Sequence, residues 1–155
     1  MNCIIVDDDE MARVSLEMLC EKINDITILK SFDNGIDAVN WLKNEDVDLV
    51  FLDIEMPDLS GIELVKSVDD LPQIIFTTSH PKYALEAFEH QVTDFLPKPR
   101  QLGILRKGVE LAKELNDNVS PQEEQSQLFV RVDGKFVRIE LDDILYIESL
   151  GDYVR

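Results

Sequence analysis

Four short apolar runs in the first hundred residues each end on polar side chains that could handle a metal ion or a phosphoryl group. The groups that follow these runs are three consecutive aspartates at 7–9, the carboxylate of Asp53, the hydroxyls of Thr77 and Thr78, and the ammonium of Lys98. Unbroken apolar runs of this length are typical of strands covered on both faces of a parallel sheet. Open α/β sheets bind ligands at the carboxyl ends of their strands, so we expect these groups to face one crevice.

The carboxylates of Asp7, Asp8 and Asp53 predict a divalent-cation site. Like charges at about 4 Å repel by roughly 4 kcal/mol at an effective dielectric constant of about 20, so converging carboxylates must share protons or hold a cation. All-oxygen ligands favour Mg²⁺ or Mn²⁺. A bound ion would let a carboxylate stay ionised and attack phosphorus, while Lys98 and Thr78 suit phosphoryl oxygens. The predicted chemistry is phosphoryl transfer to a carboxylate, giving an aspartyl phosphate.

A structural role accounts for part of the first acidic cluster. Asp8 and Asp9 precede a helical pattern, and aspartate is a good N-cap. This explains one carboxylate but not three. Asp9 lies one place further into the helix and is the weaker candidate for a metal ligand.

Strand patterns alternate with helical patterns through residue 115. The strands are expected at 2–6, 26–29, 49–53, 73–76 and 93–96, and the helices after residues 9, 35, 61, 81 and 101. This alternation predicts an α/β fold, a flavodoxin-like five-stranded parallel sheet of order 2-1-3-4-5 with helices on both faces. The first and third strands are then neighbours, which brings the aspartates together. Pro97 cannot donate to a ladder and predicts that the fifth strand lies at an edge.

The composition points to an acidic cytoplasmic protein. The 155 residues carry a formal net charge of −17, which repels phosphate backbones, so this chain alone should bind nucleic acid poorly. The sequence has no apolar run long enough to span a membrane and no signal-peptide layout at its start. Cys3 and Cys20 lie in apolar contexts and are expected to be buried thiols in a reducing compartment.

The pattern changes after residue 115. Residues 116–127 have the polar composition of a linker. Residues 128–155 form a short C-terminal β segment, with a hairpin expected around Asp133-Gly134 and a third strand at 145–147. This segment is too small to bury its own core, and it stops at Arg155 without a closing element. We therefore expect a truncated domain at the C-terminus.

Residues 1–115 resemble the receiver domain of two-component response regulators. The resemblance is carried by Ile5-Val6-Asp7-Asp8, Phe51-Leu52-Asp53-Ile54-Glu55-Met56-Pro57 with Gly61, Thr77-Thr78-Ser79 and Phe95-Leu96-Pro97-Lys98-Pro99. Each motif alone is weak, but their order along the chain at successive strand ends is highly specific.

The resemblance implies a role for each of these residues. Asp53 would accept a phosphoryl group from a phosphohistidine of a sensor histidine kinase. Mg²⁺ (or Mn²⁺) would be held by Asp7, Asp8, Asp53 and the backbone carbonyl of Glu55. Thr78 would move to bond the phosphoryl group, Lys98 would pair with it, and the Lys98–Pro99 bond would be cis, which proline permits at low cost.

Phe95 occupies the position of the family's aromatic switch residue. Many members have tyrosine there, so in this chain any readout must work through packing rather than through a hydroxyl. The alternative is that Phe95 is an ordinary core aromatic. Pro97 beside Lys98 also departs from the family pattern and would stiffen the approach to the lysine.

The tail resembles the start of a LytTR-type DNA-binding domain, as in the LytR/AlgR regulators. The matching residues are Phe129-Val130-Arg131-Val132, Ile144-Leu145-Tyr146-Ile147-Glu148 and Gly151-Asp152-Tyr153-Val154-Arg155. They cover about the first quarter of that domain, and the loops with which the family reads DNA come later. DNA would thus be bound through the full-length C-terminal domain and not by this fragment alone.

These observations lead to a phosphorylation-dependent transcription regulator, a signalling module rather than an enzyme with turnover. Phosphorylation is expected to promote a homodimer on the face of the fourth helix, fifth strand and fifth helix, where Tyr83, Leu85 and Phe88 supply apolar groups. Two alternatives remain: a stand-alone phosphorelay receiver, and a Mg²⁺-dependent phosphatase working through an aspartyl phosphate, in which Glu55 would be the second acid.

Overall fold

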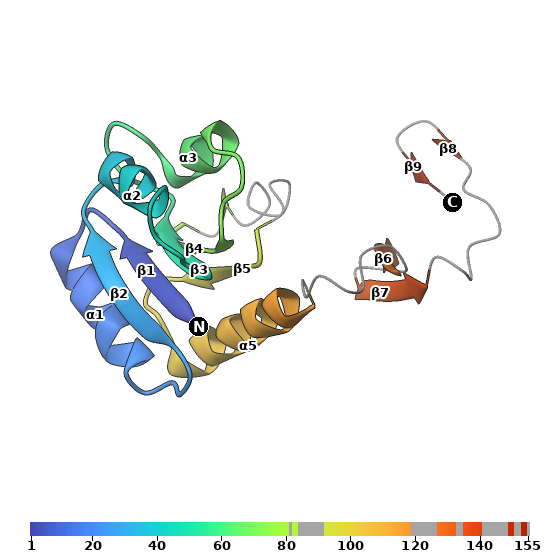
Figure 1. Ribbon diagram of the computed structural model, residues 1–155, viewed down its shortest axis with the longest axis horizontal. Helices are drawn as coiled ribbons and strands as arrows, with labels where there is room; N and C mark the ends of the chain where they lie inside the picture. Colours follow the sequence, from blue (N-terminus) through green and yellow to red (C-terminus); the bar gives the residue numbers. More distant parts are fainter. Residues whose placement is uncertain are drawn as a thin grey trace. The chain divides into compact units, whose positions relative to one another are not determined.

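The computed structural model describes residues 1–80, 82–83 and 92–118 in full, and beyond them the backbone of four short strands. The chain divides into two units, Met1–Asp117 and Asn118–Arg155, each described here by itself. The strands of the first unit are β1 (Asn2–Val6), β2 (Thr27–Phe32), β3 (Leu49–Asp53), β4 (Gln73–Thr78) and β5 (Asp94–Pro97). Its helices are α1 (Glu10–Cys20), α2 (Gly35–Leu42), α3 (Gly61–Ser67) and α5 (Leu102–Asp117) (Figure 1).

The five strands form one sheet of order β2-β1-β3-β4-β5 in which every pair is parallel. The predicted flavodoxin-like fold and strand order are confirmed. β5 is an edge strand, which places Pro97 where the missing N–H costs no ladder bond to a further strand. β1 and β3 are neighbours, so the residues that follow them emerge side by side at one edge of the sheet.

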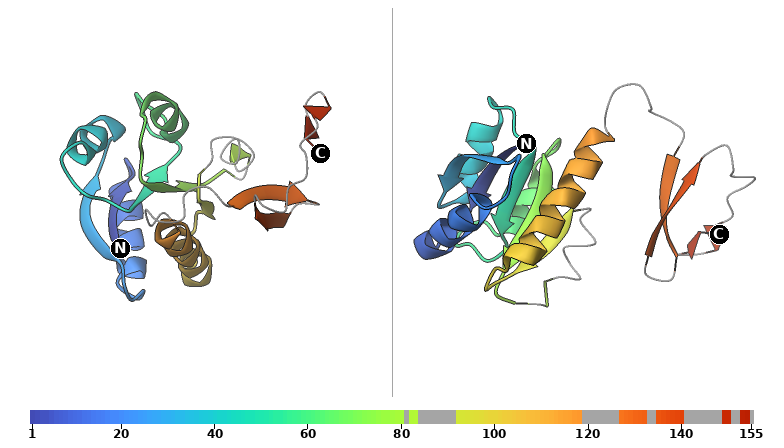
Figure 2. Two further views of the ribbon diagram at one scale, coloured as in Figure 1. Left: turned by 45° about the vertical axis from the view of Figure 1, so that its right-hand side comes forward. Right: turned by 90° about the horizontal axis from the view of Figure 1, so that it is seen from below.

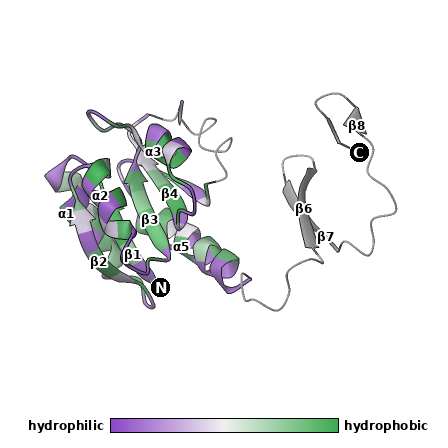
Figure 3. Cartoon of the chain, turned by 45° about the horizontal axis from the view of Figure 1, so that its top comes forward, coloured by the Kyte–Doolittle hydropathy of each residue, from purple (hydrophilic) through white to green (hydrophobic). Residues whose placement is uncertain are grey.

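Alternate residues of each central strand pack into two separate cores, one on each face of the sheet. Ile4, Val50 and Phe76 lie in the core under α2 and α3, while Ile5, Phe51 and Ile75 lie in the core under α1 and α5. The two helix layers are visible in Figures 1 and 2. In Figure 3 the central strands are green, which marks hydrophobic residues, and such strands must be covered on both faces. β3 is buried along its whole length, which gives Asp53 a rigid base.

Two local features hold the loops at the carboxyl edge. The carboxylate of Asp9 caps α1 by accepting from the N–H groups of Met11 at 2.9 Å and Ala12 at 3.4 Å. Gly61 begins α3 so close to β3 that a Cβ there would overlap the backbone carbonyl of Asp53, and its N–H donates to Ile54 O at 3.0 Å. Glycine is therefore required at this close approach, which fixes the β3–α3 loop.

Several predicted boundaries were wrong by a few residues. The second strand, expected at 26–29, runs Thr27–Phe32; the fourth extends to Thr78; the fifth is Asp94–Pro97. α5 continues to Asp117, so the first two residues of the expected 116–127 linker are helical. The expected fourth helix, with Leu85 and Phe88, lies outside the described residues, whereas Tyr83 is described and packs against the core beneath α2 and α3.

In the second unit, β6 (Gln127–Val132) pairs antiparallel with β7 (Lys135–Glu140), and β8 (Ser149–Leu150) pairs with β9 (Tyr153–Val154). The first pair is the hairpin that the sequence predicts. Its turn at 133–134 and the expected strand at 145–147 lie outside the described residues. Across the described part of the chain, no helix has the length and apolar character to cross a membrane.

Candidate functional site

Three carboxylates meet at the ends of β1 and β3. One oxygen each of Asp7, Asp8 and Asp53 lies within 4.8 Å of the others. Asp7 is 1% exposed and Asp53 is 3% exposed, while Asp8 is open to solvent. An all-oxygen donor set with one open side suits a hard divalent cation that keeps several waters. The donor set therefore fits the predicted Mg²⁺ or Mn²⁺.

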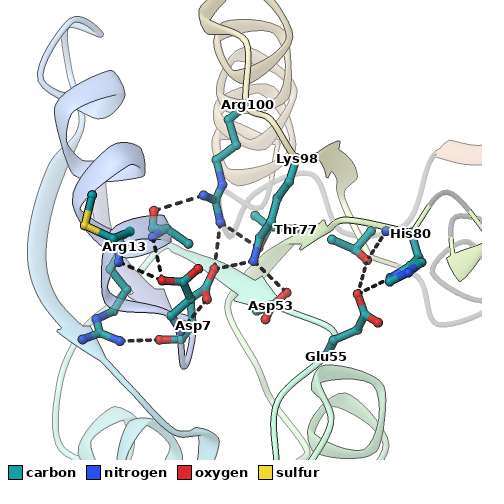
Figure 4. Close-up of polar contacts among 12 residues, drawn as sticks. Asp7, Arg13, Asp53, Glu55, Thr77, His80, Lys98 and Arg100 are labelled. Atoms are coloured by element: carbon teal, nitrogen blue, oxygen red, sulfur yellow. Dashed lines mark hydrogen bonds and ion pairs between the residues drawn. The ribbon is translucent and has the colours of Figure 1, made fainter.

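Lys98 bridges the two buried carboxylates. Its Nζ lies 2.9 Å from Asp7 Oδ2 and 3.3 Å from Asp53 Oδ1, and Figure 4 shows it reaching across from the end of β5. The lysine backbone is anchored, because its N–H donates to Thr78 O at 2.8 Å. The peptide bond from Lys98 to Pro99 is cis. The ends of β1, β3 and β5 thus bring Asp7, Asp53 and Lys98 together.

Burial and charge both act on Asp53. Loss of hydration raises the pKa of its carboxyl to about 6, the nearby charge of Asp7 adds to the rise, and the Lys98 ammonium opposes it. Among the described residues, Asp53 Oδ1 has no aligned hydrogen-bond donor, because Lys98 contacts it only as an ion pair. A buried oxygen without a hydrogen bond is unusual in a folded protein, and it is expected of a group that binds a ligand.

Thr78 belongs to a second polar cluster beside the acids. Its hydroxyl donates to Glu55 Oε2 at 3.3 Å and accepts from the N–H of His80 at 3.0 Å. His80 Nδ1 lies 2.7 Å from the same Glu55 oxygen (Figure 4). The hydrogen bond from His80 and its charge lower the pKa of Glu55. The cluster ties the loop after β3 to the loop after β4.

Sequence reasoning did not find His80. Its position carried a usable signal, because Asp53 pairs in register with Thr77. Side chains shortly after these two residues, such as Glu55 and His80, must emerge at the same edge of the sheet.

Arg100 and Arg13 are two further residues that the sequence reasoning missed. Arg100 is buried and donates from Nη2 to Asp7 Oδ2 at 2.8 Å. Arg13 donates from Nη1 to the backbone carbonyl of Asp7 at 2.7 Å. Arg100 lies on the segment between β5 and α5, where no periodic pattern specifies the side-chain direction, and Arg13 lies in the first turn of α1. The sequence reasoning considered neither residue.

Phe95 lies next to Phe76 in the β4–β5 ladder and is partly buried. It packs against the core under α2 and α3. Its position is compatible with either interpretation of this aromatic residue, a packing switch or a plain core side chain.

The sequence matches the family model described as the response regulator receiver domain over residues 3–115. The chain belongs to this family. Residues 3–115 are the receiver domain of a two-component response regulator, with the five-stranded parallel sheet that solved receiver structures share.

Relatives of this receiver include transcriptional regulators. The transcriptional regulatory protein BtsR of Salmonella typhi is 30% identical over 154 residues, which cover 94% of this chain and 64% of BtsR. Protein MrkE of Klebsiella pneumoniae is 30% identical over 162 residues, 96% of this chain and 60% of MrkE. The chain thus spans less than two thirds of the length of these relatives.

Solved receiver structures resemble this fold closely. The response regulatory domain of MrkE from Klebsiella pneumoniae is 31% identical, with a TM-score of 0.69 over 76% of this chain and 99% of that domain. A receiver domain from Clostridium thermocellum is 20% identical, with a TM-score of 0.67 over 77% of this chain and 98% of the other, and supports the fold alone.

Proposed function

We propose that Asp53 accepts a phosphoryl group from a phosphohistidine of a sensor histidine kinase. The observation that carries this proposal is the contact of Lys98 with the carboxylates of both Asp53 and Asp7 in a crevice of three converging acids. A carboxylate oxygen of Asp53 would form the new O–P bond as the P–N bond to the kinase histidine breaks. The bonding electron pair returns to the imidazole nitrogen, so no further reactant is needed.

Asp7, Asp8, Asp53 and the backbone carbonyl of Glu55 would hold Mg²⁺ (or Mn²⁺). When bound, the ion would keep the acceptor ionised near neutral pH and offset the charge of the phosphoryl oxygens. The raised pKa of Asp53, to about 6, makes such a counter-charge valuable, because a protonated carboxyl is a poor nucleophile.

Thr78, Lys98 and Phe95 would read the phosphorylated state. Lys98 would pair with a phosphoryl oxygen in place of a carboxylate, and the Thr78 hydroxyl would leave Glu55 to bond another. Phe95 would follow by repacking, since it has no hydroxyl to exchange. We expect this change to promote a homodimer through the face of the expected fourth helix, β5 and α5.

The whole protein would control transcription through a C-terminal LytTR-type DNA-binding domain, of which residues 128–155 are the start. The name of BtsR as a transcriptional regulatory protein supports a DNA-linked output. The net charge of −17 argues against DNA binding by this chain alone. Cytoplasmic localisation follows from partnership with the kinase and from the promoter target.

We propose that the chain does not turn over a substrate as an enzyme does. Its reactions are the transfer of a phosphoryl group to Asp53 and the loss of that same group. A phosphatase working through an aspartyl phosphate would turn over a generic aryl phosphate, whereas a receiver would not. A stand-alone phosphorelay receiver would carry the same modification but would have no DNA-binding output in the full-length protein.

The test is acetyl phosphate labelling with Mg²⁺, read by intact mass. Wild-type chain should gain one phosphoryl group, and Asp53→Asn should gain none. Asp9→Asn is the matched control, because it removes an acid beside the site while retaining a helix-capping oxygen. Equal labelling of wild type and Asp53→Asn would reject Asp53 as the acceptor.

A further inference from the structure

Arg100 places a buried positive charge on one of the proposed metal ligands. Its side chain is 3% exposed and comes from the segment between β5 and α5. One nitrogen, Nη2, donates to Asp7 Oδ2 at 2.8 Å and to Thr77 Oγ1 at 3.4 Å, and Nη1 donates to Ala12 O at 3.0 Å. The guanidinium therefore links the ends of β1 and β4 to the first turn of α1 (Figure 4).

Both oxygens of Asp7 are already engaged. Oδ1 accepts from the N–H of Asp9 at 3.0 Å, and Oδ2 is shared by the cations of Lys98 and Arg100. Within the described residues, the three carboxylates thus face two full positive charges at contact distance, before any metal arrives. A second cation on the same oxygen weakens the attraction of that carboxylate for a divalent ion.

The side chains of Lys98 and Arg100 differ in how easily they can move away from Asp7. The side chain of Lys98 is 19% exposed and ends in a compact, well-hydrated ammonium on a flexible stem. Arg100 is enclosed, and its rigid planar fork is fixed at three acceptors on three elements. A divalent ion can displace the lysine into solvent, but it must bind beside the arginine.

We infer that Arg100 is a positioning residue that holds Asp7 and, through its charge, sets a weak affinity for the divalent cation. The inference rests on the proposed function, since it concerns the same metal site. It makes Mg²⁺ occupancy of the free receiver depend on Arg100, two residues beyond the lysine of the site.

Divalent-cation binding measured by calorimetry, with Mg²⁺ alone as the probe, tests this inference. Arg100→Met removes the charge and keeps most of the apolar stem; we expect its Kd for Mg²⁺ to fall roughly tenfold, the lower end of what a unit charge at contact contributes in a partly solvated site. Arg100→Lys keeps the charge but loses the planar fork, so its Kd should lie closer to that of wild type than to that of Arg100→Met. A purely structural role would make both variants change together.

Two further variants serve as a substitute and as a control. Arg100→Gln is neutral and keeps a polar amide group at this position, so it serves if the methionine variant does not fold, with the same expected tightening. Arg106→Met on α5 removes an exposed arginine that also donates to a backbone carbonyl, that of Lys22 at 3.4 Å. It should leave the Kd unchanged, because this charge does not touch the acids.

The contradicting results separate the two proposals. If wild type binds Mg²⁺ and the neutral variants bind it equally or more weakly, the inference about Arg100 is wrong while the metal site stands. If neither wild type nor the neutral variants bind Mg²⁺, both the inference and the metal part of the proposed function are overturned.

Discussion

Asp53→Asn should stabilise the metal-free protein at neutral and higher pH. Burial is the main cause that raises the pKa of this carboxyl from 3.8 to about 6, with the charge of Asp7 adding to it. When the pKa of a carboxyl group is higher in the folded protein than in the unfolded chain, the folded protein becomes less stable as the pH rises from the unfolded value through the folded value. The reason is that the unfolded chain ionises more easily. Asparagine keeps the shape of the side chain and carries no charge to desolvate.

The magnitude follows from the size of the pKa shift. A rise of about two pKa units corresponds to roughly 3 kcal/mol at 1.36 kcal/mol per unit. This is the upper limit of the gain, since Lys98 keeps Asp7 as a partner but loses Asp53. The gain should be complete above the folded pKa of about 6 and should vanish below the ordinary value of 3.8.

Urea unfolding in the presence of a chelator measures this difference at both ends of the pH range. Asp69→Asn is the matched control, because Asp69 is exposed and its change should leave the free energy of unfolding within about 0.5 kcal/mol of wild type. Adding Mg²⁺ should then stabilise wild type and leave Asp53→Asn nearly unaffected. An Asp53→Asn variant that is no more stable than wild type above pH 6, or whose gain does not shrink in acid, would refute the reasoning.

Three further predictions concern the loops around the crevice. Gly61→Ala should lower the free energy of unfolding by roughly 1–3 kcal/mol, because its Cβ would overlap the Asp53 carbonyl; urea unfolding checks this, and an unchanged midpoint would contradict it. Asp9→Ala should cost about 1 kcal/mol through the lost α1 cap, whereas Asp9→Asn should cost little, and equal losses would argue against capping. His80→Ala should raise the pKa of Glu55, since the His80 hydrogen bond is the main cause that lowers it; a carboxyl NMR titration that shows no upward shift would reject this contact.

The central sheet could be predicted from the sequence because its strands are buried on both faces. Unbroken apolar runs such as Leu49–Asp53 are typical of strands in a parallel sheet. The carboxyl end of this run specified where Asp53 would lie. β2 was placed poorly because it is an edge strand with mostly exposed or half-buried side chains, Lys30 and Ser31 among them, so its apolar signal is weak. The end of α5 was missed for a similar reason, since polar residues there give no apolar period to follow.

The site was only partly predictable for a different physical reason. Asp7 directly follows β1 and Asp53 ends β3, and the geometry of these neighbouring strands fixes where the two side chains emerge, so their meeting follows from strand order. His80 and Arg100 lie on connecting segments, where no periodicity specifies which way a side chain points. Strand order places His80 at the edge of the sheet where Glu55 also emerges, but the contact between these two side chains, and that of Arg100 with Asp7, come from the tertiary structure.

The most direct test of the proposed function locates the phosphoryl group itself. The chain would be labelled with acetyl phosphate and Mg²⁺, reduced with borohydride to convert an acyl phosphate into a stable alcohol, and mapped by peptide mass. The account predicts a single reduced position at Asp53. Reduction at Asp7 or Asp8 instead, or no reduced aspartate in folded protein with Mg²⁺ bound, would contradict it.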